Sequence, residues 1–209
     1  MTRPFDDTTR RNIAGLCAAF TRARAGEPAP GLKRAAVAIA LTAADRTDET
    51  AVLLTRRASG LRAHRAQWAL PGGRCDAGEI QVQSALRELR EELGLDLGPD
   101  AVLGLLDDYP TRSGYLITPV VVWVGAEGAI VPNPQEVASV HRIPLRTVEH
   151  ETAFDFIAIP ESTRRVVRFH WDQRLIHAPT AALIYQFREV LAGRDTRVAD
   201  LEQPVFAWK

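Results

Sequence analysis

The sequence predicts an α/β domain in which helices cover both faces of a mixed β-sheet. Short apolar runs rich in Val, Ile and Leu recur along the chain, as strands do. Two amphipathic helical patterns stand among and after these runs, which favours a layered domain over an all-α or all-β one. The 209 residues, 46% of them hydrophobic, can bury a sizeable core without a disulfide or a structural metal.

The composition argues against several classes of protein. Lys and Arg number 26 and Asp and Glu number 26, so the formal net charge is +0, whereas nucleic-acid-binding domains are usually basic. Cys17 and Cys75 are too few for a disulfide framework or a structural zinc site. No apolar run reaches the length of a membrane span, and the N-terminus lacks a signal-peptide core. We therefore expect a cytoplasmic protein without nucleic-acid or membrane partners, and leave monomer and homodimer open.

The first predicted element is an amphipathic helix within residues 1–25. Asp7 or Thr8 can cap its N-terminus. Apolar residues at helical spacing, among them Ile13 and Cys17, form one face. Glycines and prolines directly after this pattern indicate a short linker.

A main domain is expected over residues 32–193. Its clearer helix spans about 80–93, and a second one spans about 179–191. A polar tail over 194–209 follows, whose apolar end at 205–208 is expected to pack against the domain. The predicted strands, of which the first two and the last two are expected to form hairpins, lie near 35–41, 51–55, 67–70, 101–106, 115–124, 137–140, 156–159 and 166–171.

Three carboxylates share one face of the helix predicted at 80–93. Glu88, Glu91 and Glu92 stand at i, i+3 and i+4, which brings their side chains together. Like charges at this spacing repel one another, whereas a hard divalent cation such as Mg²⁺ prefers several carboxylate oxygens together with water and phosphate. A solvated surface helix would carry a similar run, so the helix alone leaves both interpretations open.

The residues around this helix decide between the two interpretations. Gly73 is followed by five residues, Glu79, seven residues, Arg87-Glu88-Leu89, one residue, Glu91-Glu92, one residue, and then Gly94-Leu95. This spacing fills every fixed position of the Nudix box, so the chain resembles a Nudix hydrolase, with element order in agreement over about 34–191. The resemblance implies a Nudix α/β/α sandwich with a loop–helix–loop catalytic box. It also implies an enzyme that hydrolyses diphosphates of a nucleoside linked to another group.

The resemblance further implies a role for each box residue. The ligands it implies for Mg²⁺ or Mn²⁺ are Glu88, Glu91, Glu92 and the backbone carbonyl at Gly73. Arg87 would orient the glutamates through charge-assisted hydrogen bonds. Glu79 would hold the loop in shape, Gly94 would end the helix, and Gly72 with Gly73 would lie against the substrate.

Hydrolysis also requires a general base. In Nudix enzymes this base is a box glutamate in some members and a glutamate from a downstream loop in others. Glu136, which follows the loop Pro132-Asn133-Pro134-Gln135, is the downstream candidate. A solvent-facing residue at the start of a strand is the alternative interpretation.

The segment before the box indicates a substrate. Residues 53–73 are similar to the extra signature of the coenzyme A diphosphatase branch of Nudix enzymes, although Ala66 and Leu70 replace its Gly and Phe. The matching positions are Leu53, Leu54, Thr55, Arg57, Arg62, Pro71, Gly72 and Gly73. Coenzyme A carries a 3′-phosphate besides its diphosphate, so Arg57 and Arg62 are expected to bind substrate.

Two further positions bear on this assignment. Thr180-Ala181 matches a pair that opens the last helix in this branch, whereas His177-Ala178 departs from the aromatic-Gly pair before it. Trp68 could stack on an adenine, but core packing is the favoured interpretation.

The sequence thus supports a Mg²⁺- or Mn²⁺-dependent hydrolase that cleaves coenzyme A or acyl-coenzyme A to 3′,5′-ADP and (acyl-)4′-phosphopantetheine. The alternatives are a Nudix diphosphatase for ADP-ribose, NADH or a nucleoside triphosphate, and a non-catalytic module that senses a nucleotide.

Overall fold

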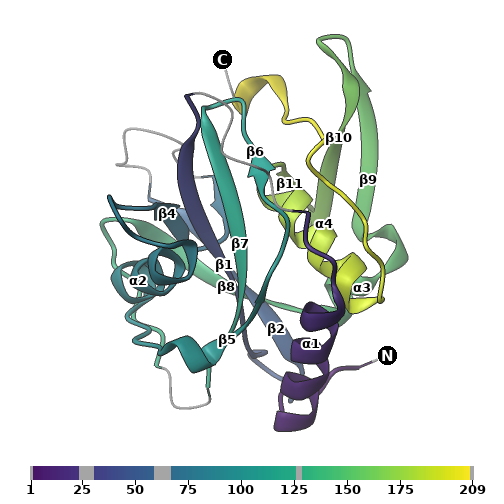
Figure 1. The fold of residues 1–209 in the computed structure, drawn as a ribbon. Helices are drawn as coiled ribbons and strands as arrows, with labels where there is room; N and C mark the ends of the chain where they lie inside the picture. Colours follow the sequence, from purple (N-terminus) through teal and green to yellow (C-terminus); the bar gives the residue numbers. More distant parts are fainter. Residues whose placement is uncertain (1, 24–30, 59–66, 126–128, 208–209) are drawn as a thin grey trace.

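Helices lie on both faces of a mixed β-sheet in the computed structural model of this chain (Figure 1). The helices are α1 (Asp7–Ala19), α2 (Gln81–Leu93), α3 (Leu145–Glu149) and α4 (Thr180–Leu191). In Figure 1, α2 lies to the left of the sheet, and α1, α3 and α4 lie to its right. The α/β/α sandwich expected from the sequence is confirmed. The structure describes residues 2–23, 31–58, 67–125 and 129–207.

The main sheet is built around β1 and contains eight strands in the described part of the chain. These strands are β1 (Lys33–Ala43), β2 (Thr50–Arg57), β3 (Trp68–Ala69), β4 (Gly72–Arg74), β5 (Val102–Leu105), β6 (Tyr109–Pro110), β7 (Tyr115–Trp123) and β8 (Val137–Pro144). β1 pairs with β2 and β4 in antiparallel fashion and with β7 in parallel, and β8 pairs with β2. The predicted hairpin of the first two strands is therefore confirmed. β4 pairs with the part of β1 against which α2 packs.

A smaller antiparallel sheet packs beside α4. Its strands are β9 (Phe154–Ile159), β10 (Ser162–Trp171) and β11 (Arg174–His177), in the order β11-β10-β9. The predicted hairpin over 156–171 corresponds to β9 and β10. Short 3₁₀ turns are η1 (Pro99–Ala101), η2 (Glu151–Ala153) and η3 (Val205–Ala207). Within the described ranges, no helix is long and apolar enough to cross a membrane.

Alternate residues of the central strand supply two separate hydrophobic layers. In β1, Ala36, Ala38 and Ala40 pack toward α2, whereas Ile39 and Leu41 pack with the buried residues of α1 and α4. Because both faces are covered, the strand is apolar almost throughout, as expected for a doubly buried strand. Small alanines on one face allow α2 to approach the sheet closely.

The structure corrects the N-cap predicted from the sequence. The first helix is capped by Asp6, not by Asp7 or Thr8: the Thr9 N–H donates to Oδ1 of Asp6 at 2.7 Å. Asp6 has an extended backbone, whereas Asp7 is already helical, and only the former conformation suits an N-cap. The predicted linker lies almost wholly in 24–30, outside the described residues.

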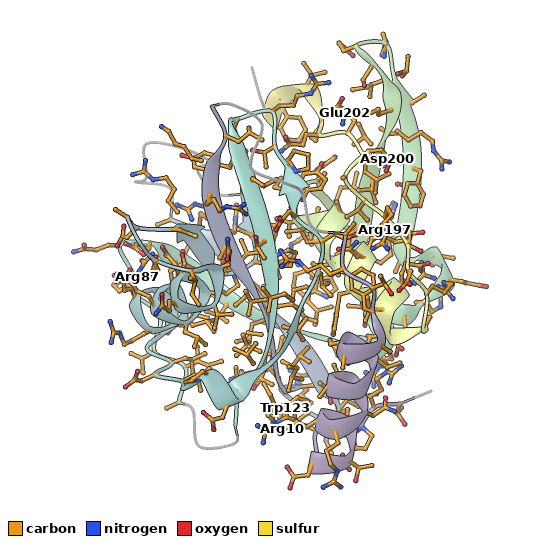
Figure 2. All side chains as sticks on the ribbon, viewed as in Figure 1. Arg10, Arg87, Trp123, Arg197, Asp200 and Glu202 are labelled. Carbon is orange, nitrogen blue, oxygen red and sulfur yellow. The ribbon has the colours of Figure 1, made fainter. Side chains whose placement is uncertain are left out.

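The C-terminal tail contacts the domain along its length. Phe206 meets the ring of His177 edge-on, with centroids 5.1 Å apart, while its side chain stays 60% exposed, and Trp208 lies outside the described residues. Earlier in the tail, Val198 and Glu202 are fully buried. Figure 2 shows Glu202 on the yellow segment that runs beside β10, and its N–H donates to the Arg165 carbonyl at 2.8 Å.

Candidate active site

α2 is held against the sheet by its apolar face. Leu89 and Leu93 are fully buried beneath it, and burying a leucine side chain stabilises a protein by about 2 kcal/mol. Gly94 ends the helix in the left-handed conformation, with φ of 69°, as the sequence predicts. The opposite side of α2 therefore carries the charged residues of the box.

β4 brings two glycines to that charged side. Gly72 and Gly73 pair with Val37 and Ala36 of β1. Gly72 has φ of +153°, and a Cβ there would lie 2.6 Å from Cα of Val37, so only glycine fits. This close approach sets the backbone of β4 directly beside the carboxylates of α2.

Glu92 is the most deeply buried of the three predicted metal ligands, at 4% exposure. Its Oε2 accepts a hydrogen bond from the Gly72 N–H at 3.3 Å, and its Oε1 lies 3.7 Å from Nη1 of Arg57. Burial raises the pKa of Glu92 to about 8; the charges of Glu88 and Glu136 also raise it, while Arg57 lowers it. The carboxylate is therefore placed where a nearby cation would stabilise its ionised form.

Arg87 connects the other carboxylates. Its Nη1 donates to Oε1 of Glu88 and to Oε2 of Glu91, both at 2.9 Å. Its Nε and Nη2 donate to the two oxygens of Glu79 at 2.9 and 3.0 Å. The guanidinium lowers the pKa of Glu79, and burial raises the pKa of Glu88. Figure 2 places Arg87 on α2, at the left of the molecule.

Glu136 lies near the same carboxylates although it is distant in sequence. Its negative charge contributes to the raised pKa of both Glu88 and Glu92. It directly precedes β8, and its backbone carbonyl accepts a hydrogen bond from the Ala58 N–H at 2.9 Å. Pairing of β8 with β2 therefore brings the candidate base to the box.

Arg57 faces the box. It is the last residue of β2, and its guanidinium lies beside Glu92. Its Nε is buried and has no hydrogen-bond partner among the described residues. An unmatched buried donor is costly, so this nitrogen suits an anionic oxygen of a ligand. Arg62, the other predicted substrate residue, lies outside the described residues.

The carboxylate oxygens of the box have the chemistry that binds a divalent cation, although they do not converge on a common point. In the described part of the chain, no three His, Cys, Asp or Glu side chains converge into a metal-binding cluster. Glu88 and Glu91 turn to Arg87, and Glu92 turns to Gly72. Carboxylates that raise one another's pKa in a partly buried site are nevertheless the donors that Mg²⁺ and Mn²⁺ prefer.

Trp68 packs on the other face of the sheet, with the core that contains α4. Its ring meets His141 and Trp171 edge-on, with centroids 4.9 and 5.4 Å apart, and the guanidinium of Arg174 lies over it at 5.5 Å. The indole is therefore partly buried against protein side chains, in agreement with the packing interpretation.

Two hydroxyl contacts near the site are not evident from the sequence. Thr55 Oγ1 donates to the Ala69 carbonyl at 3.0 Å, and Thr180 Oγ1 donates to the Trp68 carbonyl at 3.2 Å. Both threonines lie in segments that stand out in the sequence, 53–73 and 180–181, so a signal is present. Their partners cannot be read from it, because these contacts depend on tertiary packing.

A family model and two curated relatives indicate the same protein family for this chain. The family model described as "NUDIX domain" matches residues 32–168. The chain is 34% identical over 146 residues to "Uncharacterized Nudix hydrolase NudL" of Pectobacterium atrosepticum, in a match that covers 68% of this chain and 76% of that protein. It is 33% identical over 141 residues to the protein of the same description from Photorhabdus laumondii, covering 66% and 75%.

A solved structure shares the fold. A MutT/nudix family protein from Enterococcus faecalis superposes with a TM-score of 0.56 at 18% sequence identity. The match covers 80% of this chain and 65% of that protein, so this chain spans slightly less than two thirds of it.

Proposed function

Because this chain belongs to the Nudix hydrolase family and is an enzyme of its diphosphatase type, we propose that its substrate is coenzyme A or acyl-coenzyme A. The products would be 3′,5′-ADP and (acyl-)4′-phosphopantetheine. Two observations support this substrate: the signature over residues 53–73, and the position of Arg57, whose guanidinium stands 3.7 Å from Glu92. The signature carries the choice of coenzyme A, and the position of Arg57 supports binding of its diphosphate.

Arg57 is placed to bind the diphosphate itself. Its guanidinium adjoins the box, and its buried Nε, which lacks a partner among the described residues, can donate to a phosphate oxygen. We assign the 3′-phosphate to Arg62, the second arginine of the signature. Under this assignment, Arg57 acts on any diphosphate, and Arg62 distinguishes coenzyme A from nucleotides that lack a 3′-phosphate.

The reaction would be in-line attack of water on one phosphorus, with release of the other phosphate. A divalent cation held by Glu88, Glu91, Glu92 and the Gly73 carbonyl would neutralise charge on the diphosphate. We assign Glu136 as the general base that takes the proton of the attacking water, because pairing of β8 with β2 places it next to Ala58, the neighbour of Arg57, and because its charge acts on both Glu88 and Glu92. Arg87 would keep Glu88 and Glu91 in place during the reaction.

A panel of diphosphates assayed with Mg²⁺ and with Mn²⁺ tests the substrate. We expect release of 3′,5′-ADP from coenzyme A, resolved by chromatography. Turnover of ADP-ribose, NADH or a nucleoside triphosphate without turnover of coenzyme A would establish the alternative diphosphatase. Nucleotide binding without metal-dependent hydrolysis of any compound would favour the sensing module.

Dephospho-coenzyme A provides a matched control for the two arginines. We expect Arg62→Gln to raise KM for coenzyme A but not for dephospho-coenzyme A, which has no 3′-phosphate. Arg57→Gln should impair hydrolysis of both substrates equally. The opposite pattern would exchange the two assignments.

A further inference from the structure

The strand that leads to the glycines of β4 is held by buried hydroxyl groups. Thr180, at the first turn of α4, is 7% exposed and donates to the Trp68 carbonyl at 3.2 Å. Thr55, on β2, is 2% exposed and donates to the next carbonyl, that of Ala69, at 3.0 Å. β3 is thus fixed from two different elements of the fold.

The chain between this contact and the box has little freedom. Leu70 is buried at 4% exposure, and the Pro71 carbonyl accepts a hydrogen bond from the Ala38 N–H at 2.8 Å. Gly72 then donates its N–H to Glu92. Because these contacts restrict the few φ and ψ angles between Trp68 and Gly72, a shift of the Trp68 carbonyl is expected to move Gly72 as well.

Thr180 belongs to a segment beyond the family match, which ends at residue 168. The same segment also holds the side chain of Trp68, through Trp171 and Arg174. Residues after the matched domain therefore contact both the backbone and the indole of a residue that lies shortly before Gly72.

We propose that Thr180 is a positioning residue for the reaction, whose hydroxyl fixes Gly72 and Gly73 against Glu92 by way of the Trp68 carbonyl. The proposal rests on the proposed function of the box. It differs from a general stabilising role, because loss of the hydroxyl should slow turnover without weakening the binding of substrate by Arg57.

The first test compares the kinetics of Thr180→Val, Thr180→Ala and Thr180→Ser on a diphosphate that the wild-type protein hydrolyses. Small displacements of catalytic groups can cost up to about a hundredfold in rate, so we expect kcat to fall about tenfold in the valine and alanine variants. KM should change by less than about twofold. The serine variant, which retains the hydroxyl, should keep near-wild-type kcat. If the methyl group that replaces the hydroxyl in Thr180→Val prevents folding, Thr180→Ala provides the kinetic comparison.

Thr50→Val is the matched control. Thr50 is fully buried on the same strand as Thr55, and its Oγ1 donates to the Pro4 carbonyl at 3.0 Å, away from the box. This variant should lose a comparable hydrogen bond while its kcat stays unchanged. An equal fall of kcat in Thr50→Val and Thr180→Val, or an unchanged kcat in Thr180→Val, would overturn the proposal.

A second readout does not depend on hydrolysis. In the metal-free protein, the amide resonances of Gly72 and Gly73 should shift in Thr180→Val and stay in place in Thr50→Val. Unchanged glycine resonances in Thr180→Val would overturn the positioning role even if the proposed function is correct. Shifted resonances in a protein without diphosphatase activity would support the contact and refute the proposed function.

Discussion

Gly73 and Glu88 lie so close together that no side chain fits between them. A Cβ built on Gly73 would overlap Oε1 of Glu88 and lie 2.6 Å from its Cδ. The atoms in the way belong to the end of a flexible side chain, so Gly73→Ala should displace the carboxylate rather than unfold the protein. We expect kcat to fall about a hundredfold with little change in Tm, as measured by steady-state kinetics and thermal unfolding.

Gly15→Ala is the control for this variant. Gly15 lies within α1, and no heavy atom stands within 4 Å of a Cβ built there. Alanine favours a helix over glycine by about 1 kcal/mol, so Tm should rise slightly and kcat should stay unchanged. A Gly73→Ala enzyme as active as Gly15→Ala would contradict the placement of Glu88 in the site.

Arg87→Lys should impair the reaction although charge is retained. The guanidinium donates to Glu79, Glu88 and Glu91, and an ammonium group cannot reproduce this planar set of hydrogen bonds. Loss of residues that orient metal ligands typically costs about ten- to a hundredfold in activity, and we expect a decrease of that size in kcat. Arg90→Lys, an exposed position on the same helix, should leave kcat unchanged.

Glu136→Gln tests the general base. An amide cannot accept the proton of water, so kcat should fall by more than about tenfold, and the acidic limb of the pH–rate profile should be lost. Substrate KM should change little. A loss smaller than about tenfold with an unaltered profile would return the role to a glutamate of the box.

Glu202 should make the free energy of unfolding decrease at acidic pH. Arg112, Ser162 and Arg164 donate to its buried carboxylate and hold its pKa well below the usual range of glutamate. A carboxyl with a lowered pKa contributes stability above its unfolded-state pKa, and this contribution is lost as the pH falls toward the folded-state pKa. Removing one partner of a fully buried ion pair costs roughly 3 kcal/mol, and the cost here should be smaller because both arginines are partly exposed.

Urea unfolding of Glu202→Gln should therefore show a clear loss of stability at pH 7. The difference from wild type should shrink progressively as the pH falls below about 4, near the unfolded-state pKa of glutamate. Glu161→Gln, at an exposed position, should follow the wild-type curve. A constant difference between Glu202→Gln and wild type across this range would show that the ionised form is not what stabilises the tail.

Much of the fold can be predicted because its main elements carry strong local patterns. The stripe of leucines predicts α2, and long apolar runs predict β1 and β7. β4 cannot be predicted in this way. It has only three residues, two of them glycines, so it shows no strand pattern, and its pairing with β1 exists only in the folded chain. α3, with five residues, is too short to show helical periodicity.

The candidate site can be predicted only in part. The spacing of Glu88, Glu91 and Glu92 gives their common face directly. The approach of Glu136 depends on the pairing of β8 with β2, which no local pattern encodes. For the same reason, the contact between Arg57 and Glu92 cannot be read from the sequence.

Binding of Mn²⁺ to the protein tests the central claim most directly. Calorimetric titration should detect Mn²⁺ binding to the wild-type protein and to Glu161→Gln. Replacement of Glu88, Glu91 and Glu92 together by glutamine should weaken that binding at least about tenfold and abolish hydrolysis of coenzyme A. A triple variant that binds Mn²⁺ as tightly as the wild type and still hydrolyses coenzyme A would contradict the account.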